Sequence, residues 1–273
     1  MAMLWLRPVL KYALIAAIVA FFIFPIYWML ITSIKPPEYV IKYPPHLYPP
    51  EITFDAYYEA LTRLRGGAAL VNSLIIAAVS TLISMVLGTI AGHAFARYPI
   101  GGFHLPFWIL STRMMPAVAA IIPLFLLVKQ FGLMDTHAAV IALHLIVTLP
   151  FAVWMMRGFF IDVPKELEEA ALIDGCSKWG AFVRVALPVV APGLAVTTLF
   201  CFIFSWNEFV FALILTRRNA TTLPVLISGL HSSHGVLWSE LSALAAVALI
   251  PITILALFAQ KHLVRGMTMG AVK

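Results

Sequence analysis

A few polar side chains interrupt long apolar stretches of this chain, and these residues could do chemistry. Arg113, His144, Asn207 and Glu208 all lie inside such stretches. Polar groups at bilayer depth are costly, so each suggests a function. They could hydrogen-bond a passing substrate, with Trp206 offering a ring face for stacking. An ion pair between Arg113 and Glu208 that serves only the fold is an equally good interpretation, and a hydrogen bond between helices is favoured for His144.

The sequence contains no motif for catalysis or for a metal. It has no GxxxxGK[ST] phosphate loop, no HExxH and no GxSxG. His231 and His234 are two ligands without further partners, which is typical of a solvated loop. Cys176 lies in a polar segment and Cys201 in an apolar one, so neither a disulfide nor a metal site is predicted. We therefore expect no enzyme activity and no bound cofactor.

The composition is that of an integral membrane protein. Hydrophobic residues make up 62% of the 273 residues and charged residues only 11%, against about 25% charged residues in soluble proteins. The net charge of +6 comes from scattered basic residues, which do not form the clustered patch of a nucleic-acid-binding protein. We expect one transmembrane domain over residues 1–273, with a core at 70–264.

Apolar runs long enough to cross a bilayer, roughly 20 residues each, predict an all-α protein with six spans. A proline-rich loop at 34–69, with a short helix over 55–65, separates the first two spans. Lys and Arg are more frequent on the side of the termini, which favours cytoplasmic termini. The expected spans are 9–33, 70–97, 104–130, 137–160, 188–215 and 240–264. We expect kinks at Pro25, Gly88, Gly92, Pro116, Pro123 and Pro150.

Residues 162–187 form a polar segment between the fourth and fifth spans, and local signals predict two short helices there. Pro164 suits the first position of a helix, and Gly175 can adopt the left-handed conformation that ends one. Ser177 can cap a second helix, which we expect to end at Pro188. The acidic residues of this segment are Glu166, Glu168, Glu169 and Asp174.

The first of these two helices is acidic and presents small residues on one face. A helix that lies flat on a membrane would instead have a basic face and large apolar anchors. Helical spacing places Leu167, Ala170, Ala171 and Asp174 on this face. Because the alanine side chains are short, another protein can approach the helix closely. We therefore expect this helix to dock onto a protein.

The segment resembles the EAA signature of ABC importer permeases. That signature combines Glu-Ala-Ala, Asp-Gly, an apolar stretch, Leu-Pro and Pro-Gly. The matching residues are Glu169, Ala170, Ala171, Asp174, Gly175, Phe182, Val185, Leu187, Pro188, Pro192 and Gly193. The resemblance implies that the segment is the coupling helix that inserts into the ATP-hydrolysing subunit, with Glu169 and Gly175 as its central residues.

Three further runs are similar to the maltose-type carbohydrate-uptake permeases, and specifically to their smaller, six-span subunit. They are FSWNEFVFALIL (204–215), NSLIIA (from Asn72) and RGMTMGAVK (265–273). The resemblance implies the type I ABC importer permease fold. It also implies that the tail, with Gly270 and Lys273, reaches the ATPase.

By this resemblance, the chain supplies half of a path through the inner membrane for an oligosaccharide, polyol or related sugar derivative. Its partners would be a second homologous permease, an ATP-binding subunit dimer that holds the ATP and Mg, an extracytoplasmic solute-binding protein, and lipid. The alternative is an ion-coupled secondary sugar carrier that uses Arg113, His144 and Glu208 as a relay, although such carriers have paired broken helices in internal repeats. An intramembrane enzyme is a further alternative that lacks any nucleophile–base spacing.

Overall fold

The protein is almost entirely helical in the computed structural model, which describes residues 2–232 and 235–269, with side chains for 10–230 and 236–260. This confirms the expected all-α class. The helices are α1 (Ala2–Ser33), α2 (Asp55–Tyr58), α3 (Gly66–Arg97), α4 (His104–Ser111), α5 (Ala117–Gln130), α6 (His137–Ile161), α7 (Lys165–Ile173), α8 (Lys178–Ala181), α9 (Leu187–Val189), α10 (Ala191–Trp206), α11 (Val210–Leu215), α12 (Leu223–Ser228) and α13 (Trp238–Met269).

Short irregular turns and one small hairpin complete the described chain. The turns are η1 (Pro37–Tyr39), η2 (Glu59–Arg63), η3 (Thr112–Met114) and η4 (Phe182–Ala186), of which η2 and η4 are π-helical. The hairpin pairs β1 (His231–Ser232) with β2 (Gly235–Val236) in antiparallel fashion.

Four described helices are long and apolar enough to cross a membrane, and the count reaches six if two bent helix pairs are each one span. The first bent pair lies within the span expected at 104–130 and bends at Pro116, one of the expected kinks, whereas the second begins at Lys178, before the span expected at 188–215. The first bends by 88° between Met114 and Ala117, and the second by 77° between Val189 and Ala191. Pro116 explains the first bend, because the residue before a proline is driven out of the helical region. Met115 is accordingly extended, with φ −66° and ψ 127°.

The chain divides into two compact units, of which the first comprises residues 1–68 and 226–250. In this unit the side chain of Lys35 is buried. Its Nζ donates a hydrogen bond to the carbonyl of His46 and lies 4.7 Å from the ring centre of Trp28. Burial lowers the pKa of Lys35 below its ordinary value. These contacts hold the start of the proline-rich loop.

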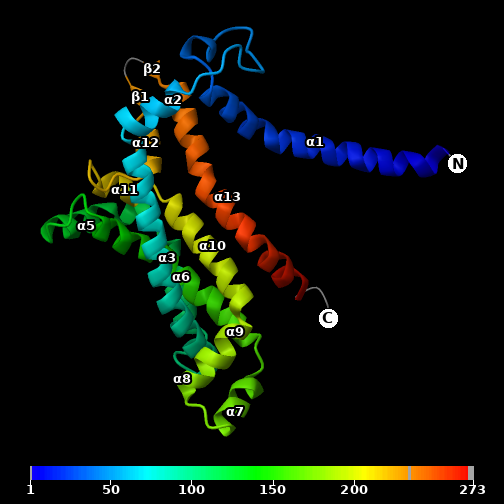
Figure 1. Cartoon of the computed structure of the whole chain (residues 1–273). Coiled ribbons are helices and arrows are strands. Elements are labelled where there is room, and N and C mark those ends of the chain that lie inside the picture. The colour runs from blue at the N-terminus through cyan, green and yellow to red at the C-terminus, as the bar shows by residue number, and fades with distance from the viewer. Residues whose placement is uncertain (1, 233–234, 270–273) are drawn as a thin grey trace. The chain divides into compact units, whose positions relative to one another are not determined.

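The second unit comprises residues 69–225 and 251–273, and its centre is the bundle of α3, α6 and α10 (Figure 1). Gly88 and Gly92 do not interrupt α3, contrary to our expectation. A Cβ on Gly88 would lie 2.5 Å from Cβ of Ala152, and one on Gly92 would lie 2.7 Å from the backbone nitrogen of Arg157. The two glycines therefore let the backbones of α3 and α6 come close together.

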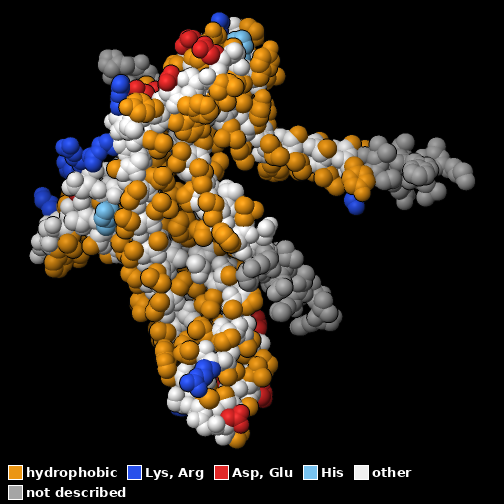
Figure 2. Space-filling view, in the orientation of Figure 1, with side chains coloured by type: hydrophobic (Ala, Val, Ile, Leu, Met, Phe, Trp, Pro, Cys, Tyr) orange, Lys and Arg blue, Asp and Glu red, His pale blue; other side chains and the backbone are white. Residues whose placement is uncertain are grey.

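Hydrophobic side chains cover most of the visible side of this bundle, and charged side chains gather near α7 at one end and beside α5 nearer the other (Figure 2). The exposed apolar band is what a helix bundle needs to contact lipid.

Candidate functional site

The polar segment forms the two short helices that its sequence predicts. Helix α7 begins at Lys165, one residue after Pro164, and the chain turns at Gly175, whose φ is +89°. The amide of Gly175 donates to the carbonyl of Leu172 at 3.1 Å, and that of Cys176 to Ala171 at 2.9 Å. This is a Schellman ending, and it requires the left-handed conformation that glycine adopts without strain.

The second helix starts as expected but extends further. Oγ of Ser177 accepts a hydrogen bond from the amide of Gly180 at 3.1 Å, which caps α8. Pro188 does not end the helix, because α8, η4 and α9 run on to Val189. Proline lacks an amide and crowds the preceding turn. The π turn η4 directly before Leu187 adapts the helix to it.

Of the eleven residues that resemble the EAA signature, seven are candidates for the contact with the ATPase, and five of these seven are exposed. Glu169, Ala170, Asp174, Gly175 and Pro188 are exposed. The remaining two candidate coupling residues, Ala171 and Leu187, are buried and half-buried. Ile173 projects from the end of α7 with 87% of its surface exposed.

Glu168, directly before this signature, faces the bundle. Its Oε1 accepts a hydrogen bond from Nε of Arg97 at 2.6 Å, and its Oε2 lies 2.8 Å from Nε2 of His93. His93 thus makes a hydrogen bond between helices, with α7 as its partner. We name His93, Arg97 and Glu168 the α3–α7 clamp. The sequence analysis missed Arg97, although the four-residue spacing of His93 and Arg97 places both on one face of α3.

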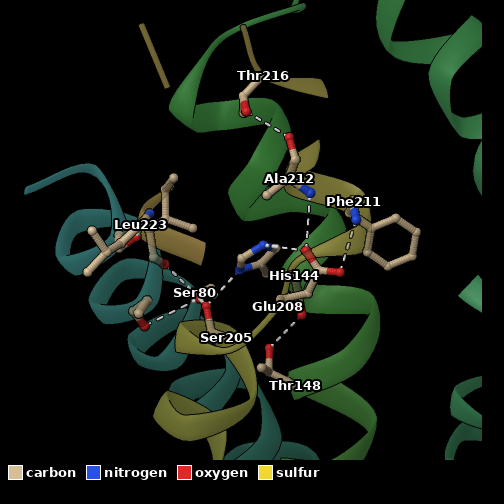
Figure 3. Close-up of polar contacts among 12 residues, drawn as sticks. Ser80, His144, Thr148, Ser205, Glu208, Phe211, Ala212, Thr216 and Leu223 are labelled. Carbon is tan, nitrogen blue, oxygen red and sulfur yellow. Dashed lines mark hydrogen bonds and ion pairs between the residues drawn. The ribbon is translucent and has the colours of Figure 1, made fainter. Parts of the chain in front are cut away.

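A second polar network lies buried in the middle of the bundle (Figure 3). Nδ1 of His144 on α6 lies 2.7 Å from Oγ of Ser205 on α10, which lies 2.8 Å from Oγ of Ser80 on α3. Oγ of Ser84 lies 2.6 Å from Oγ1 of Thr148. These contacts confirm that His144 hydrogen-bonds between helices, and they join all three central helices.

Glu208 completes this network and does not pair with Arg113. Its Oε2 lies 3.2 Å from Nε2 of His144, and its carboxylate accepts the amides of Phe211 and Ala212 at 3.0 and 3.2 Å (Figure 3). A carboxylate is favoured at the N-terminus of a helix, here α11. The expected ion pair between Arg113 and Glu208 is therefore wrong, because the carboxylate is occupied within its own segment.

Arg113 instead lies on aromatic rings. Its Cζ is 4.0 Å from the ring centre of Phe204 and 5.1 Å from that of Phe151. Among the described side chains it makes no ion pair. Trp206 is only 3% exposed, stacked on Phe202, whereas Asn207 is exposed and donates its amide to the carbonyl of Ile203.

The other end of the bundle carries an anchor that the sequence analysis missed. The carboxylate of Asp135, between α5 and α6, accepts hydrogen bonds from four consecutive backbone amides, those of residues 217–220. Partial burial acts to raise the pKa of Asp135, but these hydrogen bonds outweigh it and lower the pKa to about 2. Nδ2 of Asn72 also donates to the carbonyls of Asn219 and Thr221, and Nε2 of His137 lies 2.8 Å from its Oδ1. These contacts fix the course of residues 217–221.

Three residues named in the sequence analysis lie outside the part of the chain that the structure describes. Gly270 and Lys273 of the tail lie outside the described residues, as does His234. Among the residues that the structure describes, no group of three or more His, Cys, Asp or Glu could hold a metal. Cys176 and Cys201 are both free thiols, as the sequence predicts.

The chain is similar in sequence to several permease proteins. The chain matches the Diacetylchitobiose uptake system permease protein DasC of Streptomyces coelicolor at 33% identity, over 95% of each chain. It matches the Trehalose/maltose transport system permease protein MalG of Thermococcus litoralis at 34%, over 96% of this chain and 94% of that protein. A permease protein of Sinorhizobium fredii, y4oR, described as a probable ABC transporter component, is 35% identical over 97% of this chain and 95% of that one.

A solved structure agrees in fold. It is the crystal structure of a bacterial ABC transporter involved in the import of the acidic polysaccharide alginate. One of its chains superposes with a TM-score of 0.74 at 24% identity, covering 94% of this chain and 96% of that one. This supports the expected type I ABC importer permease fold.

Residues 84–269 match the family model described as "Binding-protein-dependent transport system inner membrane component". This match includes the polar segment, the α3–α7 clamp, His144 and Glu208, and it favours an importer permease over the secondary carrier. The chain therefore belongs to the family of inner-membrane permease components of ABC importers, and it is a multi-pass protein of that membrane.

Proposed function

We propose that this chain is the permease subunit of an ATP-driven importer for a carbohydrate, either an oligosaccharide, a polyol or a related sugar derivative. The support comes from its relatives, whose names specify diacetylchitobiose, trehalose or maltose. The chain supplies half of the translocation path, and a second homologous permease supplies the other half.

The exposed EAA segment is the observation that carries the proposal. On helix α7, the side chains of Glu169 and Ala170 are exposed on the surface of the protein, and Ile173 projects beyond them. Small side chains beside an apolar projection suit insertion into a cleft of another protein. The partner is a dimer of ATP-binding subunits, which bind the ATP and Mg, so this chain itself needs no cofactor and catalyses no reaction.

The remaining partners and the orientation follow from this arrangement. The coupling segment faces the cytoplasm, and an even number of spans then places both termini there as well. An extracytoplasmic solute-binding protein delivers the sugar at the opposite end, where the Asp135 anchor lies. The tail, with Gly270 and Lys273, is a second contact for the ATPase.

For the path itself, we propose Asn207 and Arg113 as the residues with groups free to meet a sugar. Asn207 is exposed at the break between α10 and α11. Arg113 lies at the bend before α5 on two phenyl rings, which can also stack on a sugar ring. The hydrogen bonds of His144 and Glu208 tie them into the fold, and the burial of Trp206 does the same. We therefore propose that His144, Glu208 and Trp206 maintain the shape of the translocation path.

The test is uptake by the complete importer, reconstituted with its three kinds of partner in liposomes. We expect ATP-dependent uptake of at least one of maltose, trehalose and diacetylchitobiose. Glu169→Lys and Gly175→Pro should abolish it while the amount of inserted protein stays at the wild-type level. Uptake at the wild-type rate in both variants would contradict docking through this segment.

A matched pair of glycine variants refines this test. Gly175 and Gly132 both have positive φ, +89° and +66°, and a Cβ on either meets nothing within 4 Å. Alanine at either site therefore introduces similar backbone strain, about 1–2 kcal/mol. We expect Gly175→Ala to slow uptake and Gly132→Ala to leave it near wild type, because only Gly175 sets the angle of the docking helix.

A further inference from the structure

The α3–α7 clamp joins the docking helix to the bundle through an ion pair that is almost closed to solvent. Side-chain exposure is 8% for Arg97, 12% for Glu168 and 13% for His93. Both oxygens of Glu168 are used, one by each basic residue of α3. A buried carboxylate with two such partners has a defined position, because losing Arg97 would leave its charge uncompensated and losing His93 would remove a hydrogen bond.

Arg97 extends the clamp to a third helix. Its Nη1 donates to the carbonyl of Phe160 at 2.8 Å, and its Nη2 to the carbonyl of Val163 at 3.1 Å. Phe160 lies in the last turn of α6, where backbone carbonyls lack partners within the helix. One planar guanidinium therefore binds α7 through Nε, the end of α6 through Nη1 and the linker between these two helices through Nη2.

Aromatic rings surround the His93 side of the clamp. The ring centres of His93 and Phe160 are 5.0 Å apart, and those of His93 and Phe182 are 4.7 Å apart. Phe182 begins η4, the continuation of α8. The clamp is thus in contact with both helices of the coupling segment and with α3 and α6.

Helix α7 also packs against α8 and η4 of its own segment, but its side chains offer little further attachment to α3 and α6. Of the side chains of α7, all described, only Ala171 is buried, and Leu167, Leu172 and Ile173 are 45%, 41% and 87% exposed. Besides the chain connections at its two ends, Glu168 is the polar attachment of this helix to α3 and α6.

We propose that Glu168, Arg97 and His93 are positioning residues that transmit movement of the docked coupling helix to α3 and α6. The proposal rests on the proposed function, since it needs an ATPase that moves α7. A rigid-body switch requires that the moved element carry its neighbours with it. The clamp provides this connection, while Glu169 and the exposed tip of α7 serve the ATPase contact.

The experiment measures ATP hydrolysis and opening of the outer end separately in the complete reconstituted complex. Spin labels on Asn219→Cys of this chain and on the partner permease report the distance across the outer end, in a background with Cys176 and Cys201 replaced. ATP with vanadate should change this distance in the parent complex. With Glu168→Gln or Arg97→Gln, we expect hydrolysis within about twofold of the parent and at least a tenfold loss of the population that opens.

Two further variants test whether the loss of opening is caused by losing the contacts of the clamp or only by losing a charge. Glu166→Gln removes an exposed carboxylate from the same helix and should open normally. Arg97→Lys keeps the charge but cannot reach three acceptors at once, so its opening should be intermediate. Equal opening in Glu168→Gln and the parent would overturn the proposal, as would an equal loss in Glu166→Gln.

If the loss of the clamp prevents assembly with the ATPase, a chemical cross-link between α3 and α7 provides a second test. In the double variant His93→Cys with Glu168→Cys, a short bifunctional thiosulfonate can link α3 to α7 again. Recovery of assembly and opening after linking supports the proposal, and linked protein that fails to recover contradicts it. If the parent complex itself does not open with ATP, the proposed function fails, which is a different result from opening that survives Glu168→Gln.

Discussion

At the scale of single residues, Asp135 shows how one carboxylate can order a whole loop. Four successive amides converge on it, at distances between 2.9 and 3.2 Å. We expect Asp135→Asn to lower the free energy of unfolding by about 1 kcal/mol, the low end for bonds to a charged acceptor, because the site is solvated. Thermal unfolding of the detergent-solubilised protein should show a midpoint lower by a few degrees.

The pH dependence of that difference follows from the lowered pKa. The folded-state pKa of about 2 lies below the ordinary value of 3.8, so the stabilisation is complete above about pH 4 and is lost as the pH falls through 2. The difference between wild type and Asp135→Asn should therefore stay constant from pH 5 to 8. A difference that shrinks within that range would show that a group other than Asp135 causes the effect.

Residue partners separated in sequence were the hardest to predict. The Schellman turn at Gly175 and the cap at Ser177 depend on neighbours a few residues away, and both were predicted. Arg97 and Glu168 are 71 residues apart, and Asp135 and Ala220 are 85 apart. No local pattern pairs such residues. For the same reason one of the two interpretations of Glu208 paired it with Arg113, whereas its partner is His144.

At the scale of elements, the close approach of α3 and α6 depends on glycine. A Cβ on Gly92 would lie 2.7 Å from the backbone nitrogen of Arg157 and 2.8 Å from Cβ of Met156. Backbone cannot yield as a side chain can, so Gly92→Leu should force the helices apart and destabilise the protein by about 1–3 kcal/mol. The clamp begins at the next residue of α3, His93, and this variant should therefore also reduce opening of the outer end.

Gly158 on α6 is the matched control for this prediction. A Cβ there meets nothing within 4 Å, so Gly158→Leu adds the same side chain without a clash. Thermal unfolding should separate the two variants clearly. Equal midpoints for Gly92→Leu and Gly158→Leu would mean that the helices can move apart at little cost, and that the small residues of α3 are not needed for its packing.

Hydropathy located the long apolar elements because it depends on composition alone. It could not predict their bends, since a bent span and a straight one have the same composition. The bends of 88° and 77° need partners that satisfy the freed backbone groups, and these partners appear only in the folded chain. The glycines of α3 were misjudged for the same reason, because their role is contact with α6.

At the scale of the whole second unit, α3 and α6 both connect the Asp135 anchor to the α3–α7 clamp. Helix α3 carries Asn72 near its start and Arg97 at its end, and α6 runs from His137 to the carbonyl of Phe160. The 25 residues between Asn72 and Arg97 span about 37 Å at 1.5 Å each, slightly more than the hydrocarbon thickness of about 30 Å. The two sites therefore belong at opposite membrane surfaces, which suits a unit that moves as a lever.

This placement gives a direct test of orientation with the two natural cysteines. Cys176 lies beside the Gly175 turn and is half-buried, whereas Cys201 is buried within α10. A membrane-impermeant maleimide should label wild-type protein in inside-out vesicles, where the cytoplasmic face is accessible, and not in right-side-out vesicles. Labelling should disappear in Cys176→Ser and persist in Cys201→Ser. Because the docking segment must share a compartment with the ATPase, labelling of Cys176 from the outside would exclude the proposed coupling however well the isolated fold matches its family.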